Sequence, residues 1–178
     1  ARALARRQDR LTLCELHPGD AQALAARYAG DQQVKAIEID GWLALGAFVP
    51  PKERRGVVMV DPPFEEPGEY DRLVRGLINA HRRWPTGIYL LWHAIKDVSA
   101  AKAYERALVA SGVPDMILAE LTIRRPGGET FDGCGLTIVN APYLLENQLA
   151  QLLAFLSRVL AAGPGGGQRI VRLAAEKS

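Results

Sequence analysis

The chain has 178 residues, of which 48% are hydrophobic and 24% are charged. These values fit one globular domain over residues 1–178 and exclude an intrinsically disordered chain. No uninterrupted apolar stretch approaches the ~20 residues that a membrane helix needs, so we expect a cytoplasmic protein without a membrane partner.

The two cysteines and the charge balance further limit the classes of function that the protein could have. Cys14 and Cys134 are far apart and have neither a CxxC partner nor histidines at ligand spacing, so we expect no disulfide and no metal site. The formal net charge is only +2. Arginines nevertheless cluster, at residues 2–10, 54–55, 82–83 and 124–125. Because arginine binds phosphate well but also occurs on solvated helix ends, this pattern permits a nucleic-acid partner without requiring one.

Short apolar runs predict the strands. In chain order they occupy residues 10–16, 34–40, 57–60, 87–95, 116–124, 135–142 and 169–173. Several, such as VVMV at 57–60, are continuous apolar runs typical of a buried parallel sheet. The strands at 116–124 and 135–142 flank the turn-rich sequence PGGETFDGCG with no helix between them, which indicates an antiparallel hairpin at one edge.

Helical patterns separate most of these strands. They occupy residues 19–28, 42–48, 69–84, 99–110 and 144–160. The alternation predicts an α/β fold with a mostly parallel sheet covered on both faces. GPGGGQ at 163–168 follows a helix and lacks the lysine-serine of a phosphate loop, so we interpret it as a flexible connection.

Acidic residues end the first three strands of this pattern. Glu15, Asp40 and Asp61 each follow an apolar run. Ligands of open α/β sheets bind outside the carboxyl ends of the strands, although an acid there can also cap the next helix. We expect the three carboxylates to line one functional rim.

The sequence Asp61-Pro62-Pro63-Phe64 predicts a stiff loop rich in hydrogen-bond acceptors. The prolines have no N–H and a nearly fixed φ, and Asp61 is pushed to an extended conformation. The carboxylate of Asp61 and the carbonyl of Pro62 can accept both hydrogens of an exocyclic amine, while Phe64 offers a ring for stacking. These hydrogen bonds would localise the lone pair of the amine and orient it toward an electrophilic methyl group.

This loop resembles the catalytic loop of S-adenosylmethionine-dependent amino-methyltransferases. Longer segments, in the same order, narrow the resemblance: LCELHP (13–18), EIDG (38–41), PPKERRGVVMVDPPFE (50–65), EYDRLV (69–74), RRWPTGIYLLW (82–92) and GLTIVNAPY (135–143). Together they are similar, nearly end to end, to the bacterial 23S ribosomal RNA adenine-N6 methyltransferases of the RlmJ type. The resemblance implies a Rossmann-like methyltransferase fold and a 23S ribosomal RNA substrate.

The resemblance also assigns roles to residues. Asp61, Pro62 and Phe64 would hold the target amine, with Asp61 as the central catalytic acceptor beside the cofactor. In the pocket for S-adenosyl-L-methionine, Glu15 would bind the ribose hydroxyls and Asp40 the adenine. Leu16, His17 and Trp42 would neighbour that pocket, although His17 is equally well read as a loop histidine.

Two segments depart from the family pattern. Asn140-Ala141-Pro142-Tyr143 replaces the usual Asn-Pro-Pro-Trp, and Trp92-His93-Ala94 replaces Trp-Tyr-Pro. We interpret His93 as part of a strand rather than as a substitute aromatic wall. The substrate side of the site is therefore less defined by the resemblance than the cofactor side.

The family's first strand and glycine-rich cofactor turn have no counterpart in this sequence. The chain begins in what resembles the helix leading to the second strand, so we expect a C-terminal major part of a longer protein, with the first sheet strand missing. Standing alone, these residues are expected to bind S-adenosylmethionine poorly or not at all, and to be inactive.

Two other functions stay open at this point. The same loop would serve a DNA adenine-N6 methyltransferase, because nothing in Asp-Pro-Pro-Phe distinguishes the sugar. A non-catalytic nucleic-acid-binding remnant of the same fold is the alternative from a different class. The sequence does not define the oligomeric state, and we expect a monomer.

Overall fold

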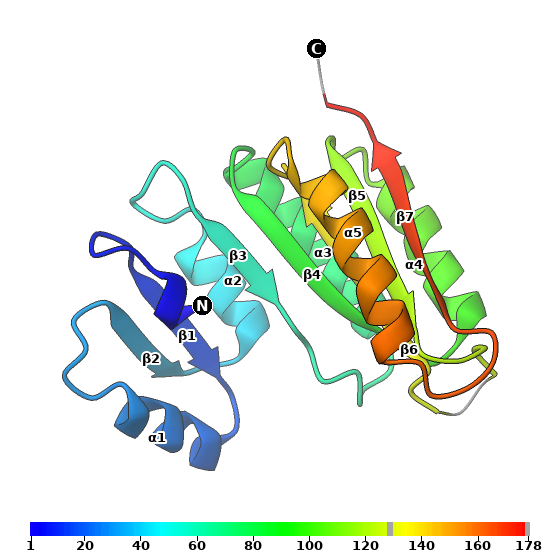
Figure 1. The fold of residues 1–178 in the computed structure, drawn as a ribbon. Helices are drawn as coiled ribbons and strands as arrows, with labels where there is room; N and C mark the ends of the chain where they lie inside the picture. The colour runs from blue at the N-terminus through cyan, green and yellow to red at the C-terminus, as the bar shows by residue number, and fades with distance from the viewer. Residues whose placement is uncertain (128–129, 177–178) are drawn as a thin grey trace. The chain divides into compact units, whose positions relative to one another are not determined.

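The computed structural model describes residues 1–127 and 130–176, and strands alternate with helices through most of them (Figure 1). The strands are β1 (Leu11–Glu15), β2 (Val34–Glu38), β3 (Val57–Val60), β4 (Ile88–Ile95), β5 (Met116–Thr122), β6 (Gly133–Val139) and β7 (Gly167–Ala174). The helices are α1 (Pro18–Arg27), α2 (Gly41–Phe48), α3 (Glu69–Arg83), α4 (Val98–Ala110) and α5 (Leu145–Val159), after a 3₁₀ turn at Arg2–Leu4.

The predicted elements are therefore confirmed, with small shifts at their ends. The start of the chain differs, because the expected helix is only the 3₁₀ turn. Of the turn-rich sequence PGGETFDGCG, residues 128–129 lie outside the described residues. The glycine-rich segment at 163–168 connects α5 to β7, as expected, and its last residues begin that strand.

Contacts divide the chain into two compact units, Ala1–Val49 and Pro50–Ser178. In the first unit β1 and β2 pair in parallel, with Glu15 beside Glu38, and α1 packs against both strands. The parallel register brings the carboxyl ends of the two strands to the same edge. The expectation that residues 1–178 form one domain stays a prediction.

The second unit contains a five-stranded sheet in the order β3-β4-β6-β5-β7. Only β3 and β4 pair in parallel, whereas the three other neighbouring pairs are antiparallel. The α/β class is confirmed, but the sheet is mixed rather than mostly parallel. The antiparallel pairing of β5 with β6 is also confirmed, but its place at the edge is wrong: β6 inserts between β4 and β5, and β7 forms the edge.

Helices cover the two faces of this sheet unequally. Figure 1 shows α5 over one face and α3 with α4 behind the other. The amphipathic spacing of α3 buries Leu73 and Leu77 completely. On the α5 side, Leu153 packs with Ala119 and Leu121 of β5. Coverage of β3 is less complete than the apolar run suggested, because Val57 and Met59 are 60% and 63% exposed.

Two further findings concern the described residues alone. No helix in the part of the chain that the structure describes is long and apolar enough to cross a membrane. Cys14 and Cys134 are both free thiols.

The close approach of β5 and β6 gives a test of the fold. A Cβ at Gly133 would lie 2.3 Å from the carbonyl oxygen of Leu121, which is backbone and cannot rotate away. We expect Gly133→Ala to reduce the free energy of unfolding by about 1–3 kcal/mol, the usual range for overpacking. Gly167→Ala is the matched control, because a Cβ there meets nothing within 4 Å. Urea unfolding of both variants of the natural gene product measures the difference, and equal stability would contradict the described register.

Candidate functional site

The carboxyl end of β3 lies beside several polar and aromatic residues in the second unit. The parallel register places Val60 beside Leu91, so Asp61 comes level with Trp92. The antiparallel register of β4 with β6 places Ala94 beside Cys134. We call this end of the sheet the Asp61 rim, defined as residues 61–64, 92–96 and 131–134.

The loop that follows β3 combines exposed acceptors with an anchored backbone. Asp61 is exposed, Pro62 is buried and Phe64 is half-buried. Phe64 has a φ of 54°, in the left-handed region that residues other than glycine seldom adopt. Strained backbone of this kind persists only where the surrounding structure holds it, and it concentrates at functional sites.

Three neighbours hold Phe64 in this conformation. The ammonium group of Lys96 donates to the Phe64 carbonyl oxygen at 3.2 Å. The rings of Tyr70 and Trp92 contact the Phe64 ring edge-on, with centroids 4.9 and 5.9 Å away. Tyr70 is fixed in turn, since its hydroxyl donates to the Ala94 carbonyl at 2.6 Å and burial raises its pKa to about 12.

The charge of Asp61 acts on the interior of the rim. Burial raises the pKa of the Cys134 thiol, a hydrogen bond with Trp92 lowers it, and the negative charge of Asp61 raises it further. Cys134 belongs to the same rim as Asp61 and Trp92. Nothing in the local sequence around Cys134 singles it out as a neighbour of this loop.

A buried aspartate organises the part of the Asp61 rim that precedes β6. The Asp132 side chain accepts hydrogen bonds from the Arg124 guanidinium at 2.8 Å, the Thr130 hydroxyl at 2.8 Å and the Gly127 amide at 3.0 Å. Arg124 also donates to the carbonyl oxygen of Phe131 at 3.2 Å. Hydrogen bonds from Gly127 first, and then from Thr130, hold the pKa of Asp132 below its usual range.

The first unit holds the other two predicted acids, Glu15 and Asp40, at one edge of its sheet. Glu15 ends β1 and accepts from the His17 amide at 2.8 Å through Oε1. Asp40 follows β2 and caps α2, accepting from the amides of Trp42 and Leu43 at 2.7 and 3.0 Å through Oδ1. The capping alternative for Asp40 is therefore real. Each carboxylate keeps a second oxygen that has no hydrogen-bond partner among residues 1–127 and 130–176.

The same edge has features that fit an adenosine. Leu16 is 61% exposed directly after Glu15, and Trp42 is half-buried at the start of α2. An apolar surface beside free carboxylate oxygens suits a purine ring and ribose hydroxyls. His17 instead lies 3.2 Å from Asp20 in an exposed ion pair, which favours its interpretation as a loop histidine.

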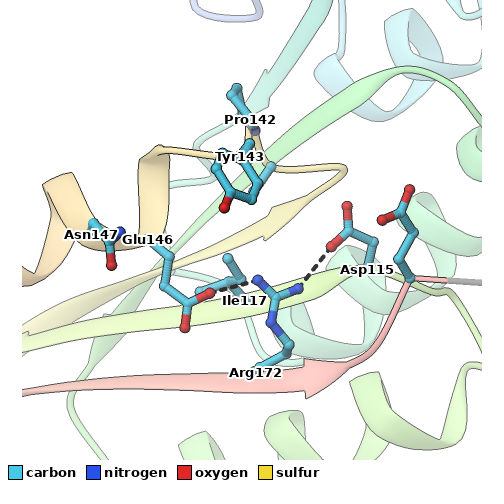
Figure 2. A pocket seen from close by; sticks show the side chains of 9 residues that line it. Asp115, Ile117, Pro142, Tyr143, Glu146, Asn147 and Arg172 are labelled. Carbon is cyan, nitrogen blue, oxygen red and sulfur yellow. Dashed lines mark hydrogen bonds and ion pairs between the residues drawn. The ribbon is translucent and has the colours of Figure 1, made fainter.

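The segment Asn140-Ala141-Pro142-Tyr143 lies at the other end of the five-stranded sheet from Asp61. It follows β6, and Asn140 donates to the carbonyl oxygens of Pro85 and Gly87, both at 2.7 Å. A cavity there is lined by Arg172, Asp115 and Glu146, and Arg172 forms ion pairs with the two acids at 2.9 and 2.5 Å (Figure 2). This departure from the family pattern therefore leaves the Asp61 rim untouched.

His93 belongs to β4, and its side chain is buried against one face of the sheet. It is 1% exposed, its ring lies 4.9 Å from that of Tyr104, and its Nε2 is 3.8 Å from the Glu120 carboxylate. The interpretation as a strand residue is confirmed. Across the described ranges, no group of three or more His, Cys, Asp or Glu side chains is arranged to hold a metal ion.

The order of strands and helices, with an Asp-Pro-Pro-Phe loop at the carboxyl end of β3, is that of a Rossmann-like methyltransferase fold. A family model described as "RsmJ: Ribosomal RNA large subunit methyltransferase D, RlmJ" matches residues 1–173. The chain belongs to this family.

Relatives and a solved structure agree with that assignment. The chain is 33% identical to ribosomal RNA large subunit methyltransferase J of Haemophilus influenzae, over 90% of this chain and 57% of the relative. It is 34% identical to the protein of that name from Escherichia coli, over 93% and 60%. A crystal structure of a Legionella pneumophila protein of the family DUF519 superposes with a TM-score of 0.87 at 29% identity, over 96% of this chain and 63% of that one. The chain thus spans about three fifths of these relatives.

The anchoring of Asp132 predicts a pH dependence. Its folded pKa is depressed below the ordinary 3.8, so the stabilisation is complete above that value and is lost as the pH falls through the lowered pKa. We expect Asp132→Asn to lower the melting temperature of the natural gene product at pH 7. The gap between variant and wild type should narrow progressively as the pH falls below 3.8. A gap that persists unchanged at low pH would show that the charge of Asp132 is not what holds the segment.

Proposed function

We propose that the protein is an S-adenosylmethionine-dependent methyltransferase that acts on the exocyclic N6 amine of an adenine in 23S ribosomal RNA. The observation that carries the proposal is the loop at residues 61–64, which presents the exposed Asp61 at the carboxyl end of β3 and holds Phe64 at a positive φ. Membership of the RlmJ family supports the same reaction.

The loop supplies the chemistry that an aryl amine needs. The amine is a weak nucleophile because its lone pair is delocalised into the purine ring. Acceptance of its two hydrogens by the Asp61 carboxylate and the Pro62 carbonyl would localise that pair, while Phe64 stacks on the base after it leaves its own stack. As the new N–C bond forms, the S–CH3 bond of the sulfonium would break and leave a neutral thioether, and the amine would lose a proton that Asp61 would accept.

The first unit supplies acceptors for the cofactor. S-adenosylmethionine would provide a methyl group made electrophilic by its sulfonium. The free carboxylate oxygens of Glu15 and Asp40 would accept from the ribose hydroxyls and the adenine amine. Leu16 and Trp42 would contact the purine. Binding by residues 1–178 alone is expected to be poor.

The substrate is proposed from the family and from charge. Both relatives carry the name ribosomal RNA large subunit methyltransferase J. Exposed Lys96 and Arg125 lie at the same end of the sheet as Asp61 and suit an RNA backbone. We propose a monomer that meets its RNA in the cytoplasm.

Substitution of Asp61 tests the proposal most simply. We expect Asp61→Ala in the natural gene product to reduce kcat for methylation of 23S ribosomal RNA by at least about a thousandfold, since the central acceptor is lost. Glu66→Ala is the matched control, because it removes an exposed acid from the same loop and should leave kcat within about twofold. The rate is read from radiolabelled methyl transfer to the RNA.

The alternatives give different results. A loss of less than about tenfold in Asp61→Ala, worth ~1.4 kcal/mol, would be too small for a central catalytic group. Methylation of DNA but not of 23S ribosomal RNA by the wild type would favour the DNA enzyme. Nucleic-acid binding without cofactor binding would favour a non-catalytic remnant.

A further inference from the structure

Phe131 has an exposed aromatic ring, and neighbouring residues hold both the ring and its backbone in place. Its side chain is 44% exposed, and its ring stacks on Trp92 with the centroids 6.4 Å apart and the planes 14° from parallel. Trp92 thus lies beside the ring in a nearly parallel orientation, and the ring still retains a large exposed area. Single exposed apolar residues are common, so exposure alone carries nothing.

The backbone around Phe131 is fixed by hydrogen bonds. Its own carbonyl accepts from Arg124, and the following residue is the buried Asp132 with its three side-chain hydrogen bonds. The Asp132 amide also donates to the Ile95 carbonyl at 3.1 Å. An aromatic ring held this firmly at the surface loses little conformational entropy when a flat partner stacks on it.

Phe131 continues a row of rings that begins in the Asp61 loop. Trp92 contacts both Phe64 and Phe131, with ring centroids 5.9 and 6.4 Å away. If Phe64 receives the target base, Phe131 lies one ring further along this series of contacts. It is therefore placed for a neighbouring nucleotide rather than for the target adenine.

Charge at the rim indicates the chemistry of the partner. Among residues 1–127 and 130–176, the one hydrogen bond of the Lys96 ammonium goes to the Phe64 carbonyl, and exposed Arg125 makes no ion pair. An exposed ring at the same end of the sheet as these cations suits a nucleotide, which has both a π-face and a phosphate. An apolar protein surface would not use these charges.

We propose that Phe131 binds a nucleotide adjacent to the target adenine by stacking on its base. The proposal rests on the proposed RNA methyltransferase function and names a substrate-binding residue outside the Asp61 loop. Because stacking is made in both the ground state and the transition state, it should affect RNA affinity far more than the chemical step.

The test compares Phe131→Ala, Phe131→Leu and Phe131→Tyr in the natural gene product. For a single-stranded RNA oligonucleotide containing the target adenine, we expect Phe131→Ala to raise KM and Kd roughly 5- to 100-fold, the range for loss of one stacked base. Its kcat at saturating RNA should stay within about twofold. Phe131→Tyr, which keeps the ring, should retain affinity, and Phe131→Leu, which keeps apolar bulk alone, should lose it.

Phe155→Ala is the matched control, since Phe155 is 54% exposed on α5 and lies outside the Asp61 rim. It should leave KM, Kd and kcat unchanged. Wild-type affinity in Phe131→Ala or in Phe131→Leu would overturn the stacking role while leaving the proposed function intact. Kd is measured by fluorescence anisotropy without cofactor, so the stacking test does not depend on methylation. Failure of the wild type to methylate the RNA would contradict the proposed function and not the stacking role.

Discussion

The stiffness of one short loop is the constraint on which the proposed site depends. Two successive prolines remove backbone N–H groups and limit φ, so the end of β3 presents acceptors without competing donors. Phe64 then adopts a positive φ of 54° that the chain would not hold unaided. Lys96, Tyr70 and Trp92 supply the restraint through one hydrogen bond and two ring contacts.

The register of the sheet brings together the residues that restrain this loop, which come from distant parts of the sequence. Parallel pairing sets Trp92 beside the loop, and the inserted antiparallel strand β6 adds Cys134 and the Asp132 segment at the same end. If β6 lay at the edge of the sheet, these residues would be remote from β4. The mixed topology is therefore part of how the rim is built, as is the burial of Asp132 among its three donors.

Much of the fold followed from local patterns, whereas the pairing of strands did not. Apolar runs and helical spacing define every strand and α-helix, because burial acts on each segment separately. Strand order depends on contacts between segments far apart in the chain, so the place of β6 was missed. The unusual local sequence at the end of the third strand identified Asp61, Pro62 and Phe64 as candidate site residues. Lys96, Phe131 and Asp132 carry no such signal, since their roles arise only when β4 and β6 lie side by side.

The central claim is that a rigid pair of acceptors at residues 61 and 62 faces the methyl donor. A crystal structure of the natural gene product with bound S-adenosylhomocysteine tests it directly. We expect the sulfur atom of the ligand to be turned toward the Asp61 carboxylate. A ligand bound elsewhere, or an Asp61 side chain that points away from the sulfur, would contradict it.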